Sequence, residues 1–364
     1  MNDALKSRDI AKILYHSVGN DNLASDGERG FVRRISAIDN ITKVGIADLT
    51  SLKMAFSLAA SDDPYTHSPT YYAVTGRRGL WMNKHLGEKG EVTTFFFCLH
   101  PNLKDTVVIF PPFGEQPLDS LGRFLQEVRD TEMSFRIGRV PRDLVLEEIQ
   151  NRFPQITATR TKETVLDWTY PVHTIDCAAL VNREGREYGR IRQTMNKFKR
   201  SSSMTREIDF SRDVNALQSL AQQWEAKTNH YDRYDLRTNY FNYLARLAVE
   251  QRSLNLRGLI VSVEGQDAGF SIWEPESNGG KTANLFASQV SDFNTTNLAT
   301  YLTVVSAEQM LAEGAEFMCL GGSETEGMDR YKQGFIQTYS TPLDTIELSV
   351  PEDFEAHPAE DFEI

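Results

Sequence analysis

The run from Arg257 to Leu320 constrains the fold more than any other part of the chain. In "RGLIVSVEGQDAGFSIWE", two apolar and β-branched stretches flank the polar residues Glu264 to Asp267, which predicts an antiparallel hairpin. "ANLFAS" predicts a further strand, and "TTNLATYLTVVSAEQMLAEG" predicts a long helix capped by a threonine and closed by Gly314. "EFMCL" predicts a buried strand that leads into a polar loop. This order indicates an α+β or α/β domain with a mainly antiparallel sheet.

The first half has a looser version of the same order. "TYYAVTG", "TTFFFCL", "TVVIF" and "SFRIGRV" predict strands, whereas "IADLTSLKMAFSL", "LDSLGRFLQEVRD" and "RDLVLEEIQNRF" predict helices. A connector follows at about 154–171, then the helices "DVNALQSLAQQWEAKT" and "NYFNYLARLAVEQRS", and late in the chain the strand "TIELSV". We therefore expect lobes at 1–160 and 170–350 and an acidic, disordered tail at 351–364. An unrelated N-terminal α+β domain remains the alternative.

Composition narrows the class of protein. The 364 residues are 40% hydrophobic and 25% charged, as in soluble globular proteins. No apolar run is long enough to cross a bilayer, and the N-terminus lacks the pattern of a signal peptide, so we expect a cytoplasmic protein without a membrane partner. The three cysteines lie far apart beside apolar residues, which favours buried reduced thiols. The seven histidines have no metal-ligand spacing, so we expect no metal.

One basic stretch stands out in a chain with a net charge of −12. Eight Lys and Arg residues and only two acids, Glu184 and Glu187, lie between Arg183 and Arg206. Ile191, Met195 and Phe198 fall on one face of the helix that this stretch predicts, and the bases occupy much of the rest. The stretch therefore indicates either a localised contact with a polyanion or a solvated helix face.

The element order of the second half resembles that of GNAT acyltransferases. In that fold two central strands splay apart, and the gap and the next helix N-terminus hold the acyl donor. Here that place is "ASQVSDFNTTNLATYL", which enters the helix near Thr295 or Thr296. Coenzyme A users normally carry glycines there, but none lies between Ala287 and Tyr301. The pyrophosphate of coenzyme A would thus lack its usual backbone cradle.

Three stretches resemble the C-terminal domain of phosphatidylglycerol lysyltransferases and their soluble relatives, enzymes that use aminoacyl-tRNA. They are "REYGRIRQTMNKFKR", "SLAQQWEAKT" and "GMDRYKQGF", and the likeness covers most of 45–345. The matching positions are Tyr188, Arg192, Asn196, Phe198, Trp224, Gly327, Lys332 and Phe335. The resemblance implies tandem GNAT-like lobes, each with a mixed, mainly antiparallel sheet flanked by helices. This chain departs from the lysyltransferases in lacking transmembrane helices. Between the "ANLFAS" strand and its helix they usually carry an Asp and an Arg, whereas this chain has Asp292 and Gln289 but no arginine.

The resemblance also implies site residues. Lys332 would lie by the donor ester, and Asp292, Glu324 and Tyr331 are candidates to take or relay a proton; their structural alternatives are a helix cap, an exposed loop acid and a packed aromatic. The implied tRNA contacts are Arg186, Arg190, Arg192, Asn196, Lys197, Lys199, Arg200 and Arg330. The implied substrate contacts are Trp224, His230, Tyr231, Thr295 and Thr296, although core packing is the alternative for Trp224.

The function that follows is transfer of an amino acid from aminoacyl-tRNA to an amine or hydroxyl of a soluble acceptor. That acceptor is a small metabolite, a carrier-bound intermediate or a peptide, for example in natural-product biosynthesis. No cofactor is expected besides aminoacyl-tRNA as co-substrate. Two alternatives stay open: an acyl-CoA-dependent GNAT N-acyltransferase and a non-catalytic tRNA-binding module.

Overall fold

The structure is a computed structural model of the chain. It describes residues 25–44, 65, 68, 70–71, 80–86, 92–100, 103–114, 117–141, 145–163, 166–228, 255–277, 281–291 and 295–356. The chain divides into two compact units, each discontinuous in sequence. The N-terminal lobe comprises 20–45, 75–169 and 342–364, and the C-terminal lobe comprises 1–19, 46–74 and 170–341.

The N-terminal lobe contains a seven-stranded sheet in the order β1-β2-β3-β4-β5-β14-β6. Its strands are β1 (Ile41–Lys43), β2 (Leu80–Leu86), β3 (Val92–Leu99), β4 (Thr106–Ile109), β5 (Ser134–Pro141), β6 (Thr157–Thr161) and β14 (Leu343–Ser349). Its helices are α2 (Asp26–Ile35), α5 (Pro117–Val128) and α6 (Val145–Arg152). Among the described strands of this sheet, only β4 and β5 run parallel to each other, because α5 connects them as a crossover.

Aromatic residues dominate the core of this lobe. Phe95 and Phe97 on β3 point to the face that α5 covers, and both are fully buried. Phe124 of α5 packs between them, with ring centroids 5.3 and 4.7 Å away. Tilted and edge-on ring pairs at these separations each add about 0.5–1.5 kcal/mol beyond the burial of their area.

The C-terminal lobe contains a second seven-stranded sheet, in the order β13-β7-β12-β11-β10-β9-β8. Its strands are β7 (Val172–Asp176), β8 (Ser203–Glu207), β9 (Arg257–Val263), β10 (Gln266–Ser277), β11 (Thr282–Val290), β12 (Phe317–Cys319) and β13 (Tyr339–Thr341). Its helices are α7 (Cys177–Asn182), α8 (Gly189–Lys199), α9 (Val214–Thr228), α12 (Leu298–Ala312) and α13 (Glu326–Gln333). One core joins α7, α8 and α12 to one face of this sheet, whereas α9 packs on β10 and β11 from the other.

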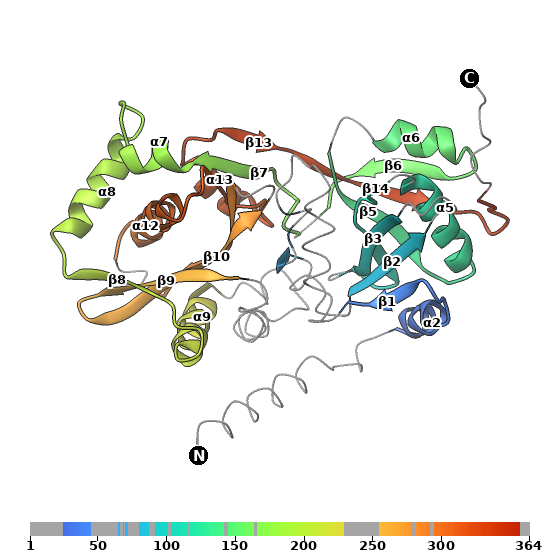
Figure 1. The fold of residues 1–364 in the computed structure, drawn as a ribbon, viewed down its shortest axis with the longest axis horizontal. Coiled ribbons are helices and arrows are strands. Elements are labelled where there is room, and N and C mark those ends of the chain that lie inside the picture. Colours follow the sequence, from blue (N-terminus) through green and yellow to red (C-terminus); the bar gives the residue numbers. More distant parts are fainter. Residues whose placement is uncertain are drawn as a thin grey trace, which may run out of the picture. The chain divides into compact units, whose positions relative to one another are not determined.

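The two sheets have the same internal order, with one strand exchanged between them (Figure 1). β14 lies between β5 and β6 in the N-terminal sheet, and β7 lies in the corresponding place next to β12 and β13. β7 follows β6 in the chain but belongs to the C-terminal sheet, and β14 follows β13 but belongs to the N-terminal sheet. The last strand of each half of the sequence therefore completes the sheet of the other lobe. The expected tandem of GNAT-like lobes is confirmed.

The structure differs from the expected lobe organisation in four places. The strand at 343–349 joins the N-terminal sheet, not the C-terminal one, and 46–74 belongs to the C-terminal lobe. The connector at 154–171 contains β6. The acidic tail is ordered over 351–356, because Phe354 is 1% exposed and packs on Phe153 with ring centroids 5.8 Å apart.

Other local expectations have mixed outcomes. The hairpin is confirmed, but its turn is shorter than the expected Glu264–Asp267. Glu264 and Gly265 take positive φ values of 53° and 80°, as a two-residue turn requires, and Gln266 and Asp267 already belong to β10. Thr70 and Tyr71 are helical, not part of a strand. All three cysteines are buried free thiols, as expected. The helices predicted at 46–58 and 239–253 lie outside the described residues.

Candidate active site

The candidate site lies where two neighbouring strands of the C-terminal sheet separate. β11 and β12 run parallel and pair only over Thr282–Asn284 and Phe317–Cys319. β11 continues to Val290, whereas β12 gives way to the polar loop 320–325. Beyond Asn284, the backbone groups that β11 turns toward β12 lose their partners in that strand. We call this opening the fork.

Lys332 is held against the loop that follows β12. It lies on α13, not in a loop as the glycine-rich sequence suggests, because Thr325 caps this helix by accepting a hydrogen bond from Met328 N. The half-buried Lys332 Nζ donates to the carbonyl oxygens of Gly322 at 2.5 Å and Gly321 at 3.3 Å. These contacts fix a positive charge at the end of β12, beside the fork.

A buried His–Asp pair anchors α13 to the sheet. His173 of β7 and Asp329 of α13 are 98% and 95% buried, and Nε2 lies 2.7 Å from Oδ1. Gln333 donates to the other oxygen of Asp329 at 2.7 Å, and Ser340 Oγ lies 3.2 Å from His173 Nδ1. Sequence reasoning missed this pair, because its members are 156 positions apart and neither lies in a recognisable spacing.

Tyr331 is a phenol that is poorly suited to act as a base. Its hydroxyl lies 2.9 Å from Thr303 Oγ1 of α12, although the side of its ring leaves the residue 40% exposed. Burial of the hydroxyl raises the pKa of Tyr331 to about 12, and the hydrogen bond with Thr303 opposes this only in part. The residue therefore can donate a hydrogen bond at neutral pH but cannot take a proton.

The N-terminus of α12 lies next to the basic helix. The expected threonine cap is not found; the cap position is Asn297, whose φ of 69° places it in the left-handed region and whose side chain makes no capping bond. Lys197 of α8 donates through Nζ to the carbonyl oxygen of Thr296 at 3.0 Å. Thr295 is half-buried and its carbonyl accepts from Leu298 N. One predicted tRNA contact and two predicted substrate contacts are thus brought together.

The basic face of α8 is exposed to solvent. Ile191, Met195 and Phe198 are buried, as the helical spacing predicts. The predicted tRNA contacts on the other face are exposed; they are Arg186, Arg190, Arg192, Asn196, Lys197, Lys199 and Arg200. Arg192 is fixed by two bonds from Nη1, to the carbonyl oxygens of Arg183 at 2.5 Å and Gly185 at 2.6 Å.

The remaining predicted site residues are partly exposed or lie outside the described residues. Glu324 is half-buried in the loop before α13, and Arg330 is exposed and paired with Glu326 one turn away. Trp224 is half-buried on α9. Asp292, His230 and Tyr231 lie outside the described residues.

A second set of buried polar residues lies on the opposite face of the C-terminal sheet. Glu274 of β10 is 5% exposed and accepts hydrogen bonds from Ser68 Oγ at 2.6 Å and Thr70 Oγ1 at 2.7 Å. Burial raises the pKa of Glu274, and the two hydroxyl bonds oppose that rise. Sequence reasoning missed it because Glu274 ends an apolar strand run and its partners are about 200 positions away.

The corresponding place in the N-terminal lobe is filled by a tryptophan. The parallel pairing of β4 with β5 ends at Ile109 and Ile137. Trp168 packs there so closely that a Cβ on Gly138 would lie 2.8 Å from its ring. Its indole N–H donates to Thr345 Oγ1 of β14 at 2.9 Å.

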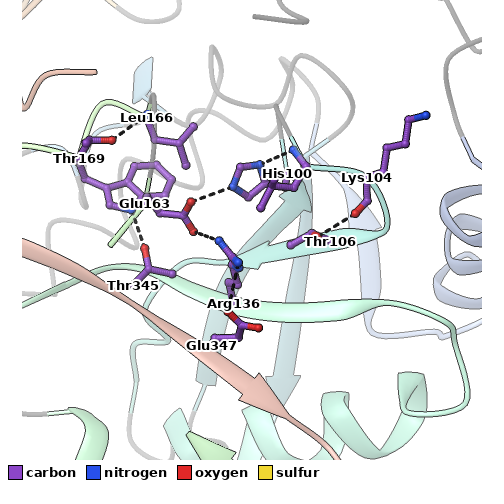
Figure 2. A network of polar contacts seen from close by, with 11 residues as sticks. His100, Lys104, Thr106, Arg136, Glu163, Leu166, Thr169, Thr345 and Glu347 are labelled. Carbon is purple, nitrogen blue, oxygen red and sulfur yellow. Dashed lines mark hydrogen bonds and ion pairs between the residues drawn. The ribbon is translucent and has the colours of Figure 1, made fainter. Parts of the chain in front are cut away.

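A polar network of the same lobe, centred on the buried Glu163, is drawn in Figure 2. Arg136 donates to Glu163 Oε1 at 2.8 Å and to Glu347 Oε2 at 3.1 Å. His100 Nε2 lies 3.2 Å from Glu163 Oε2, and Leu103 N donates to His100 Nδ1 at 3.0 Å, which leaves the ring proton on Nε2. Each of these side chains is bound to another within the lobe, although Arg136 Nε is buried without a partner. We therefore interpret the network as a structural link between the end of β3, β5, β14 and the segment after β6.

Comparison with known proteins decides the family. A family model described as "Phosphatidylglycerol lysyltransferase, C-terminal" matches residues 79–340, well over half of the chain. The chain belongs to this family. Membership supports an acyltransferase with a GNAT-like fold. A search of curated proteins gave no match. Among the described residues, no helix combines the length and apolar character needed to cross a membrane.

Solved structures share the fold of this family member at low identity. A conserved protein of unknown function from Bacteroides thetaiotaomicron VPI-5482 has a TM-score of 0.65 at 13% identity, over 85% of this chain and 99% of that one. L-PGS from Bacillus licheniformis has a TM-score of 0.56 at 11% identity, over 84% and 92%. FemX has a TM-score of 0.55 at 11% identity, over 86% and 97%. At these identities the likeness concerns the fold alone.

Proposed function

We propose that this protein transfers an amino acid from aminoacyl-tRNA to an amine or hydroxyl of a soluble acceptor. The observation that carries the proposal is the fixed ammonium of Lys332 at the end of β12, in a lobe whose exposed basic helix is tied to the start of α12. Family membership supports the transferase class. The basic helix suits the phosphate backbone of an RNA acceptor stem, because exposed Lys and Arg side chains bind phosphates without reading the sequence.

The reaction requires little of the protein beyond positioning and charge. The acceptor's nitrogen or oxygen attacks the ester carbonyl, an oxyanion forms, and the ribose hydroxyl leaves with a proton. Lys332 would stabilise the developing negative charge or a nearby phosphate, since a positively charged donor in a half-buried setting binds an anion better than water does. Tyr331 would add a neutral hydrogen-bond donor once its hydroxyl releases Thr303 Oγ1, to which it is bound in the structure. The proton that the acceptor loses goes to Glu324, Asp292 or the leaving ribose oxygen.

The proposal predicts that Lys332→Ala slows transfer while the protein stays folded. Losing the charged contact costs about 2–4 kcal/mol in the transition state, roughly 30- to 1,000-fold in rate. The lost contacts include two charge-assisted bonds from a half-buried ammonium to carbonyl oxygens, so the free energy of unfolding falls by about 1–3 kcal/mol. Single-turnover transfer is measured from bulk tRNA charged with a labelled amino-acid mixture to a set of soluble amines and peptides, beside a thermal melt.

Two further variants test whether the effect is specific to position 332 and whether it depends on positive charge. Lys281→Ala removes an exposed lysine that precedes β11 and pairs with Glu316, and it is expected to leave transfer unchanged. Lys332→Arg restores part of the rate if charge is what matters. Unchanged transfer by Lys332→Ala contradicts the role of this residue. Wild-type protein that binds tRNA and transfers nothing favours the non-catalytic alternative, and label on phosphatidylglycerol vesicles contradicts the soluble acceptor.

A further inference from the structure

Tyr65 lies in the fork between β11 and β12. Its hydroxyl donates to the carbonyl oxygen of Leu285 at 2.7 Å, and Leu285 is the first residue of β11 beyond the pairing with β12. On the other side of the fork, a Cβ added to Gly321 would lie 3.0 Å from the same hydroxyl oxygen. Tyr65 is 5% exposed, so its ring is enclosed there.

Neighbouring residues hold this tyrosine in place. Its ring packs edge-on against Phe286 at 5.0 Å and Tyr71 at 5.6 Å between centroids. Ser68 and Thr70, from the same stretch of chain, bind the buried carboxylate of Glu274, and Ser68 Oγ also accepts from Tyr71 N at 3.0 Å. A buried carboxylate that accepts two hydroxyl bonds is a strong anchor, because removing either donor would leave a buried acceptor unsatisfied.

A fork of this kind otherwise suits a narrow chain that carries amide groups. The backbone carbonyls and N–H groups that face an opening between two strands bind an extended amide chain as they would bind another strand. The pantetheine arm of coenzyme A has this chemistry, and the fold implies it as a donor carrier. In this chain the Leu285 carbonyl is already bound to Tyr65, and the ring of Tyr65 fills the space that such an arm would need.

The start of α12 also fits coenzyme A poorly. The segment leading into it has no glycine from Ser288 to Thr300, so side chains border every backbone N–H that would face a pyrophosphate. Asn297 stands at the cap position, and Lys197 is bound to the adjacent Thr296 carbonyl. The residues present therefore do not fit the carrier that the fold implies.

We infer that Tyr65 determines donor specificity by closing the fork to acyl-coenzyme A. The inference deepens the proposed function and rests on it for the accepted donor, aminoacyl-tRNA. The ester of that donor would approach from the surface of α8 and α13, so no part of it has to pass between β11 and β12. The exclusion of acyl-coenzyme A can be tested separately from the proposed function, since binding of this ligand can be measured without any aminoacyl transfer.

The test measures acetyl-coenzyme A binding by calorimetry to the full chain and to two variants. Wild-type protein and Tyr65→Phe, which keeps the ring, are expected to give no measurable heat with about 1 mM ligand. Tyr65→Ala opens the fork and is expected to bind at least tenfold more tightly than that limit. Wild-type binding as tight as that of Tyr65→Ala overturns the inference, and so does a folded Tyr65→Ala that binds none.

A second measurement covers a Tyr65→Ala variant that fails to fold. Hydrogen exchange of wild-type protein is followed at 65–71 and 285–290 with and without acetyl-coenzyme A. No change is expected; altered exchange in these segments would show that the ligand enters the fork despite Tyr65. Aminoacyl transfer is assayed in parallel, and its absence counts against the proposed function while leaving the ligand-binding result to decide this inference.

Discussion

At the scale of single residues, Glu163 shows how partners set the charge of a buried group. Burial alone would raise its pKa, but the hydrogen bonds from His100 and Arg136 and the charge of Arg136 outweigh burial, and the pKa lies below its ordinary value of 4.5. The folded protein therefore favours the carboxylate. Its contribution to stability is present above about pH 4.5 and is lost as the pH falls through the lowered pKa.

Glu163→Gln is accordingly expected to make the free energy of unfolding less dependent on pH at acid pH. The slope of unfolding free energy against pH should fall by up to about 1.4 kcal/mol per pH unit below pH 4.5, the value for one proton. Urea unfolding from pH 3 to 7 measures it. Glu347→Gln serves as the control, because Glu347 shares Arg136 but its side chain is 50% exposed. If both variants lower this slope equally, the pH dependence does not come from the buried position of Glu163.

Residue-level chemistry could be predicted only where neighbours in sequence carry it. The crowding of Arg330, Tyr331 and Lys332 after a buried strand pointed to the end of β12, where the structure has a fixed ammonium. Tyr65 and Glu274 could not be found in this way. Their significance comes from hydrogen bonds across some 200 positions, which no local spacing encodes.

At the scale of elements, α8 carries the predicted electrostatic contact. We expect tRNA binding to weaken steeply with salt, because each phosphate neutralised releases counterions. Replacing Arg192, Lys197 and Arg200 with Ala should lower the slope of log K against log salt by about 2–3 units. A triple variant at the exposed residues Lys104, Arg212 and Lys281 removes the same charge outside α8 and should leave the slope unchanged. Equal effects from both triples would mean that only net charge matters.

Periodicity predicted the long elements well and the short ones poorly. The hairpin β9–β10 and helix α5 have enough apolar residues at one period to identify them, whereas α12, which is apolar around much of its circumference, is identified by its length and by the closing Gly314. Strands β7 and β6 are not predicted by periodicity, because "VHTID" and "TATRT" mix polar residues with few apolar ones. These strands form because neighbours in the sheet supply their hydrogen bonds, a long-range property that a window of sequence does not contain.

At the scale of the whole molecule, the exchange of β7 and β14 makes each sheet depend on both halves of the chain. β6 pairs with β14 and with no other described strand, so the N-terminal sheet lacks an attachment for β6 without the end of the chain. β14 also supplies the buried Ile346 and Leu348, and Phe354 follows it into the same core. The boundary between lobes that the sequence suggests is thus not a boundary between folding units.

This dependence predicts the behaviour of a chain divided between Thr169 and Tyr170. Residues 1–169 alone are expected to be insoluble or to unfold without cooperativity, because β5 and β6 lose the strand between them and a hydrophobic edge is left exposed. Co-expression with residues 170–364 should restore a soluble complex that purifies as one species. Solubility, co-purification and thermal melts measure these outcomes.

A rescue variant isolates β14 as the cause. Val172 and Thr341 are paired residues on β7 and β13, so the chain leaves and re-enters the N-terminal lobe at neighbouring points. A short Gly-Ser linker from Thr169 to Pro342 should therefore let 342–364 pair with β5 and β6 in a single chain. We expect this fusion to be soluble and to melt cooperatively. If residues 1–169 are soluble and cooperative without β14, the exchanged strand is not required, and the N-terminal lobe folds from contiguous sequence after all.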